Sequence, residues 1–206
     1  MRNRKPGRRR SGGKRKLLLV SIGVLVVLAA AGVGAYAFYG HQQQANTAGA
    51  IGINAGDKAP NMPIYLTNGT STTLSSFQGH AVLVWVVATW CPGCQETAPL
   101  IASQYYSQLR SASVTLLTVE DYNDLGYSGP TMTQFASQYA GGAGSHNGWL
   151  FADTSQSATY TYNPQADLDI WYLVGPSGTI VTSGLNLGST IQSAITAADS
   201  LQTATP

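Results

Sequence analysis

The feature that most limits the fold of this chain is an uninterrupted apolar run at residues 81–89, AVLVWVVAT. A run that is rich in β-branched residues and has no polar face indicates a strand buried on both sides, as at the centre of a sheet covered by helices. The residues WCPGC follow it immediately. Because proline is favoured at the first position of a helix, Pro92 predicts a helix that begins there, with Cys91 at the strand-to-helix turn. This order of elements indicates an α/β domain.

Further strands and helices are expected to alternate along the chain. Asn68-Gly69 predicts a tight hairpin turn in which both residues have positive φ. Pro99 predicts a kink in the helix after the cysteines, which is expected to end near Arg110 and to bury Leu100, Ile101, Tyr105 and Leu109. The other expected elements are a strand at 113–120, a helix at 131–140, a hairpin at 170–185 and a helix at 189–202. Alternating strands and helices predict a central sheet.

The charges of the chain are divided unevenly between its ends. Residues 1–16 carry nine of the eleven Lys and Arg residues and no acid, whereas the chain from residue 40 onward has two bases and nine acids. The 23 residues between them, 17–39, are apolar and uncharged. At about 1.5 Å per residue, such a helix crosses the roughly 30 Å core of a bilayer. The sequence therefore predicts a transmembrane helix at 17–39, with a cleaved signal peptide as the alternative.

The basic residues before the span set its expected orientation. By the positive-inside rule, residues 1–16 form a cytoplasmic tail, and such a tail beside a span indicates contact with lipid rather than with nucleic acid. Residues 40–56 are polar and rich in glycine, which is typical of a flexible linker. The remaining 150 residues, 57–206, suit one domain with a hydrophobic core. The expected location is the cell membrane, with a single span and the domain outside the cytoplasm.

Residues 56–100 resemble the opening of membrane-anchored, extracytoplasmic thioredoxin-like proteins of the redoxin and thiol–disulfide interchange type. The shared features are Ala59-Pro60, the Asn-Gly hairpin, LSSFQGH before the buried strand, ATWC with a second cysteine, and Pro99 five residues after Cys94. YLVGPSGTI is similar to the late hairpin of the same family. Over about residues 57–200, the resemblance implies a thioredoxin-like fold: a central mixed β-sheet flanked by helices.

The chain departs from this family at three positions. Trp85 stands where the family usually has a buried Asp or Asn that helps to move protons. Thr97 stands where the cytochrome c maturation branch has a glutamate, and Glu96, one place early, is expected on another face of the helix. The proline that usually faces the cysteines is expected near Asp169, but the nearest proline is Pro164.

Three roles are open for the two cysteines. A Cys-x-x-Cys disulfide could be structural, although it closes a loop too short to restrict the unfolded chain much. Metal binding needs more ligands than two thiols, and the three histidines, His41, His80 and His146, have no metal-like spacing. A copper chaperone of the cytochrome oxidase assembly type is the serious form of this alternative, since that family shares the late hairpin. It carries a histidine shortly before the hairpin, where this chain has Asp167 and Asp169, which are poor ligands for copper(I).

Thiol–disulfide exchange is the third and favoured role. Cys91 at a helix N-terminus has its thiolate stabilised by unpaired N–H groups and the helix dipole, and Cys94, one turn later, can resolve the mixed disulfide. Trp90, Pro92 and Gly93 surround the dithiol as auxiliary residues. A peroxiredoxin is disfavoured because Ala88 replaces its threonine. No cofactor or metal is expected. The expected partners are client protein thiols or disulfides and, since there is no third cysteine, a separate redox protein or small thiol.

Overall fold

The computed structural model describes residues 49–142, 144 and 146–203, and the described residues belong to one compact unit. Within these residues, no helix has the length and apolar character that a membrane crossing requires. The predicted tail at 1–16, the predicted span at 17–39 and most of the predicted linker lie outside the described residues.

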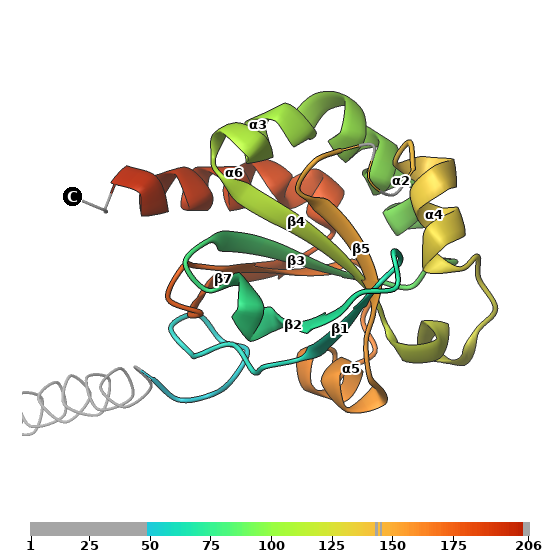
Figure 1. Ribbon diagram of the computed structural model, residues 1–206, viewed down its shortest axis with the longest axis horizontal. Helices are drawn as coiled ribbons and strands as arrows, with labels where there is room; N and C mark the ends of the chain where they lie inside the picture. The colour runs from blue at the N-terminus through green and yellow to red at the C-terminus, as the bar shows by residue number, and fades with distance from the viewer. Residues whose placement is uncertain (1–48, 143, 145, 204–206) are drawn as a thin grey trace, which may run out of the picture. The chain divides into compact units, whose positions relative to one another are not determined.

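A mixed, seven-stranded β-sheet forms the centre of the domain (Figure 1), in the order β2-β1-β5-β4-β3-β6-β7. The central strand β3 pairs in parallel with β4 and antiparallel with β6. The strands are β1 Pro63–Leu66, β2 Ser71–Thr73, β3 Ala81–Val87, β4 Val114–Glu120, β5 Trp149–Asp153, β6 Ile170–Val174 and β7 Ile180–Leu185. The expected fold, a mixed sheet flanked by helices, is confirmed.

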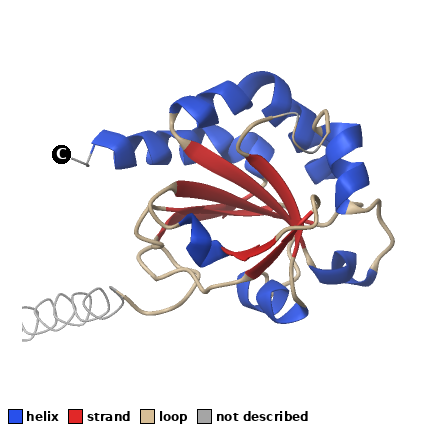
Figure 2. Ribbon diagram, viewed as in Figure 1, coloured by secondary structure: helices blue, strands red, loops and turns tan. Residues whose placement is uncertain are grey.

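Helices cover both faces of the sheet (Figure 2). One face packs against α2, α3, α4 and α6, and the other against η1 and α5. Alternate residues of β3 enter the two cores: Leu83, Trp85 and Val87 on the first face, and Val82, Val84 and Val86 on the second. The helical elements are η1 Leu74–Phe77, α2 Pro92–Leu100, η2 Ile101–Tyr105, α3 Tyr106–Ser111, η3 Tyr122–Gly126, α4 Met132–Tyr139, α5 Gln156–Tyr162 and α6 Leu187–Thr203.

The helix after the cysteines is interrupted as its proline predicts. Pro99 lies inside α2, and the next five residues, η2, form a π-helical turn before α3 begins. Because proline has no N–H and its ring crowds the preceding turn, the regular hydrogen-bond ladder cannot pass through it. Of the four side chains expected on the buried side, Ile101 and Leu109 are fully buried, and Leu100 and Tyr105 are half-buried.

The first hairpin forms where expected, but its turn differs from the prediction. Gly69 has a φ of 84°, whereas Asn68 is not among the residues with positive φ. The side chain of Asn68 instead accepts a hydrogen bond from the N–H of Thr70 at 2.9 Å. The expectation of two positive φ angles was therefore wrong, because the asparagine side chain closes the turn without a left-handed backbone.

One strand and one α-helix were missed in the sequence: β5 and α5. The apolar part of β5, WLFA, is short and follows a glycine-rich loop, and α5, QSATYTY, contains Thr and Tyr residues with modest helix propensity. Parallel pairing of β5 with β4 and the Ser155 cap on the N–H of Ala158 stabilise them. Tertiary pairing with β4 therefore decides β5, whereas α5 begins at a local serine cap that the sequence analysis overlooked.

The described end of the predicted linker is folded against the domain. The N–H of Gly52 donates to the carbonyl of Lys58 at 3.0 Å, and the N–H of Gly56 donates to the carbonyl of Ile180 at 2.9 Å. The side chain of Asp57 is buried and accepts a hydrogen bond from the N–H of Asn54. The folded segment therefore begins before residue 57, the boundary predicted from glycine content alone.

Candidate functional site

The two cysteines lie where β3 ends and α2 begins. Cys91 is the N-cap residue of α2, with extended backbone angles, and Pro92 follows in the first turn, as predicted. The N–H of Cys91 donates to the carbonyl of Ala88 at 3.0 Å. The N–H of Cys94 donates to the Cys91 sulfur at 3.3 Å. Cys91 therefore occupies the capping position at which a helix N-terminus stabilises an anion.

The two thiols are free and buried, and their acidities are driven apart. The pKa of Cys91 falls to about 7, chiefly because the Cys94 thiol donates a hydrogen bond to its sulfur, with burial opposing and the Cys94 N–H adding to the effect. The pKa of Cys94 is raised by the same hydrogen bond, by burial and by the negative charge of Cys91. Near neutral pH, Cys91 is therefore the thiolate and Cys94 the thiol.

Asp124, which the sequence did not single out, holds the loop before the cysteines. Its carboxylate accepts hydrogen bonds from the N–H and the hydroxyl of Thr89, both at 2.6 Å, and its carbonyl accepts one from the Trp90 indole at 2.8 Å. The Gln95 side chain donates to the Thr89 carbonyl at 2.8 Å. These bonds connect η3 to the loop and fix the approach of the chain to Cys91.

The backbone around Asp124 is unusual. Asn123, Asp124 and Leu125 have φ values of 52°, 51° and 58°, a left-handed conformation that costs each non-glycine residue about 1–3 kcal/mol. Gly129 also packs tightly here: a Cβ at this residue would lie 2.2 Å from the Thr89 hydroxyl and 2.5 Å from an Asp124 carboxylate oxygen. The composition of the segment, YNDLG, was the available signal, since Asn, Asp and Gly tolerate left-handed angles best.

Trp85 and Asp169, two departures from the family pattern, contact each other. The Trp85 indole donates to Asp169 Oδ1 at 2.6 Å, and the N–H of Leu187, at the start of α6, donates to the same oxygen at 3.1 Å. Asp169 is only 4% exposed. Burial raises its pKa, and the bonds from Trp85 and Leu187 oppose this. A buried carboxylate therefore lies beside the dithiol, although it is absent from β3 where the family places it.

The auxiliary residues surround the dithiol on its exposed side. Trp90 is half-buried, and its ring centroid lies 5.0 Å from that of Tyr127, which is 68% exposed. Pro92 and Gly93 are both exposed. The structure thus brings Trp90, Pro92 and Gly93 together with Cys91 and Cys94, and adds Tyr127 to the aromatic surface beside the thiols.

The two residues after Cys94 that bear on the cytochrome c branch take opposite environments. Thr97 is buried and lies against Gly188 of α6, where an added Cβ would be 2.6 Å from its hydroxyl. Glu96 is exposed, so it lies on a different face of α2 from the buried Thr97, as expected. α2 therefore places no glutamate where the cytochrome c maturation branch has one.

The histidines in the described residues lie at the far end of the sheet from the dithiol. β3, β4 and β5 are parallel, and His80 and His146 come before their first residues, whereas Cys91 follows the last residue of β3. The described residues contain no group of three His, Cys, Asp or Glu side chains that could hold a metal ion. His41 lies outside them. The arrangement does not bring His146 to the cysteines as the copper alternative requires.

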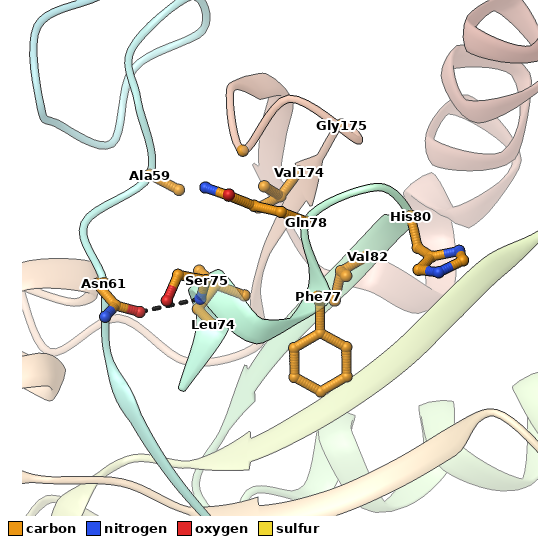
Figure 3. A pocket seen from close by; sticks show the side chains of 11 residues that line it. Ala59, Asn61, Leu74, Ser75, Phe77, Gln78, His80, Val82, Val174 and Gly175 are labelled. Atoms are coloured by element: carbon orange, nitrogen blue, oxygen red, sulfur yellow. Dashed lines mark hydrogen bonds between the residues drawn. The ribbon is translucent and has the colours of Figure 1, made fainter. Parts of the chain in front are cut away.

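A small pocket also lies at that far end (Figure 3). Its lining includes Asn61, Gln78, His80 and Val82, and Asn61 accepts a hydrogen bond from the N–H of Ser75 at 2.9 Å. Its volume is about 30 Å³, enough for about one water molecule. The dithiol therefore does not belong to this cavity. It lies at the surface loops after β3, an arrangement that suits a protein substrate better than an enclosed small molecule.

A low-pKa cysteine at a helix N-terminus, a second thiol one turn later and a thioredoxin-like sheet together define a thiol–disulfide oxidoreductase. The family model for Redoxin matches residues 54–173, which is more than half of the chain, and the chain therefore belongs to the Redoxin family. The predicted relation to redoxins is confirmed.

Individual relatives agree with this membership. The chain is 29% identical over 168 residues to the thiol-disulfide oxidoreductase ResA of Bacillus subtilis, covering 82% of this chain and 84% of ResA. Among solved structures, a putative thiol:disulfide interchange protein DsbE from Chlorobium tepidum is similar, with a TM-score of 0.54 and 18% identity over 71% of this chain and 99% of that one.

A structure from the alternative class is similar to the same degree. BsSco, a member of the Sco family of cytochrome c oxidase assembly proteins, gives a TM-score of 0.51 and 17% identity over 73% of this chain and 97% of its own. At such identities the two solved structures support the fold alone. The choice between exchange and copper binding depends on the site itself.

Proposed function

We propose that this protein exchanges disulfides with client proteins through Cys91 and Cys94, in a domain held outside the cytoplasm by its N-terminal span. The observation that carries the proposal is the opposite acidity of the two thiols: Cys91 with its pKa lowered to about 7, and Cys94 with its pKa raised. A structural disulfide requires no such asymmetry, whereas an exchange reaction requires one nucleophile and one reserve thiol.

Reduction of a client proceeds in two displacements. The Cys91 thiolate attacks a sulfur of the client disulfide, a bond forms between the two sulfurs, and the other client sulfur leaves as a thiolate that takes a proton. Cys94 then loses its proton and attacks the Cys91 sulfur. The second client thiolate leaves, and the Cys91–Cys94 disulfide holds the two oxidising equivalents. The reverse sequence oxidises a client dithiol, and a redox partner protein or a small thiol resets the site.

The auxiliary residues support this exchange. The fixed loop of Thr89 and Trp90 holds Cys91 in its capping position. The half-buried ring of Trp90 and the exposed ring of Tyr127 offer an apolar surface to a polypeptide that approaches the sulfur. Exposed Pro92 and Gly93 leave the approach open. Aromatic residues with exposed faces are common anchors in protein recognition.

The location is proposed from sequence. The basic residues in 1–16 and the uncharged stretch 17–39 favour a single span with the domain outside the cytoplasm. Protease added to intact cells is expected to digest the domain and leave residues 1–16 protected. Degradation of the N-terminus in place of the domain would reverse the topology.

The decisive experiment compares two substitutions in cells. Cys94→Ala keeps the attacking thiolate but removes the group that clears the mixed disulfide, so covalent client complexes should accumulate under acid quench and separate on reduction. Cys91→Ala should trap few complexes, because the remaining thiol, Cys94, is fully buried, and burial still disfavours its thiolate when Cys91 is absent. A structural disulfide predicts similar small losses of stability and no trapping in either variant. A copper site predicts loss of metal in both and, again, no trapping.

A further inference from the structure

The second displacement requires a group that removes the proton from Cys94. In the reduced dithiol the hydrogen bond to Cys91 raises the pKa of this thiol, and burial, the next cause, still raises it when Cys91 is in a mixed disulfide. Once Cys91 is in a mixed disulfide, Cys94 must ionise within a buried site before it can attack. A nearby base that accepts this proton would accelerate the step, and general bases contribute about 10²–10⁴-fold to such steps.

We infer that Asp169 is this base: its carboxylate takes the proton of Cys94 through one bridging water, and later returns it to a leaving thiolate or to solvent. The inference rests on the proposed function, since it assigns a residue to its second displacement. The transfer conserves the proton, requires no further reactant, and leaves Asp169 neutral while the Cys91–Cys94 disulfide forms.

The two oxygens of Asp169 have different surroundings. Oδ1 accepts both hydrogen bonds, from the Trp85 indole and from the N–H of Leu187, which orients the carboxylate. Oδ2 accepts none among the described residues and faces the dithiol. A Cβ built on Gly93, between the two cysteines, would lie 3.9 Å from Oδ2 and 3.9 Å from the Cys91 sulfur. The glycine is exposed, so water can reach the space between Oδ2 and the Cys91 sulfur, and the Cys94 thiol lies next to this space because it is hydrogen-bonded to that sulfur.

Electrostatics agrees with this geometry. The negative charge of Asp169 raises the pKa values of both thiols, which places the carboxylate within electrostatic reach of each sulfur. Burial raises the pKa of Asp169 above that of an ordinary aspartate, toward the range in which a base is effective near neutral pH. Its position is secured in the chain, because its carbonyl also accepts a hydrogen bond from the N–H of Asn186 at 2.8 Å.

The test separates the two displacements in the full-length reduced protein. Attack of Cys91 on 5,5′-dithiobis(2-nitrobenzoate) releases one coloured thiolate at a rate proportional to reagent concentration. Attack of Cys94 on the mixed disulfide releases a second one at a rate independent of concentration. The leaving group needs no proton, so the second phase reports how Cys94 is deprotonated and attacks.

Asp169→Asn is the informative variant. Asparagine keeps an acceptor for Trp85 and Leu187, and it tolerates the φ of 61° at this residue. We expect the second phase to slow about 100-fold at pH 7, with the first phase unchanged or faster. Asp121→Asn is the matched control, because Asp121 is also buried and has a pKa raised to about 7, but it is not among the groups that shift the pKa of either thiol; both of its phases should match the wild type.

Three results would overturn the inference. In the first, the rate of the second phase in Asp169→Asn stays within twofold of the wild-type rate. In the second, Asp121→Asn slows its second phase as much as Asp169→Asn does. In the third, the second phase of Asp169→Asn is faster than that of the wild type, as loss of a purely electrostatic repulsion would make it. If the variant does not fold, the wild type decides: its second phase must level off above the pKa of Asp169, and a rate proportional to hydroxide throughout would exclude an internal base. Failure of the function itself would be seen separately, as an absence of trapped clients.

Discussion

Three carboxyl groups away from the dithiol, those of Glu120, Asp121 and Asp153, have raised pKa values. We therefore predict that this domain loses stability as the pH rises from 5 to 7. Glu120 pairs across β4 and β5 with Asp153, and burial, with the charges of Asp124 and Asp153, raises its pKa to about 8. Burial raises the pKa of Asp121 to about 7 and that of Asp153 as well. In this window the folded state binds more protons than the unfolded state, so the free energy of unfolding falls with increasing pH.

The size of the effect follows from the pKa of Glu120. A carboxyl that titrates at 4.5 when unfolded and at about 8 when folded loses about 1.4 kcal/mol per pH unit between those values. The limit for Glu120 from pH 5 to pH 7 is thus about 3 kcal/mol, and half of this is a reasonable expectation for a group that shares its proton with Asp153. The prediction is limited to pH 5–7 because Cys91 begins to ionise near pH 7. Its lowered pKa makes the free energy of unfolding rise with pH, which opposes the effect of the carboxyl groups.

The assay is urea unfolding of the reduced protein at pH 5, 6 and 7. Glu120→Gln removes the titrating group and keeps a donor for Asp153, so it should raise stability at pH 7 by about 1–2 kcal/mol and leave it nearly unchanged at pH 5. Glu96→Gln, at an exposed position on α2, is the control and should change neither value. A wild-type stability that rises from pH 5 to pH 7, or equal effects of the two variants, would refute the reasoning.

Two further predictions concern the scaffold and the nucleophile. Asp124→Ala leaves the buried N–H and hydroxyl of Thr89 without an acceptor, so the free energy of unfolding should fall by about 2–5 kcal/mol; a loss below 1 kcal/mol in urea unfolding would show that η3 does not hold the loop. The rate of iodoacetamide alkylation at Cys91 should reach half its maximum near pH 7, with Cys94 unmodified, as mass spectrometry can establish; a midpoint above pH 8.5 would remove the evidence for a preformed thiolate.

The elements around the dithiol could be predicted because their causes are local. The apolar run of β3, the proline after Cys91 and the kink at Pro99 each act through residues within one or two turns of the chain. The same holds for the capping position of Cys91, whereas the chief cause of its lowered pKa, the hydrogen bond from the Cys94 thiol, was not predicted. The late hairpin and the C-terminal helix were likewise predicted from short patterns.

The partners of the dithiol could not be predicted in the same way. Asp124 lies 35 residues from Thr89, and Asp169 lies 84 residues from Trp85. In the sequence, Asp169 marked a missing proline and a missing copper-binding histidine, and Trp85 marked a missing acid; their hydrogen bond appears once β3 and β6 pair side by side.

Local sequence thus determined the nucleophile, its helix and the buried strand that carries them. Tertiary structure alone decided which carboxylates surround them, because the ends of strands distant in sequence meet at one edge of the sheet. A backbone forced into left-handed angles at Asn123, Asp124, Leu125 and Asp169 then orients those side chains. Such a conformation is unfavourable for each residue by itself, and it persists only because buried hydrogen bonds formed across the fold outweigh its cost.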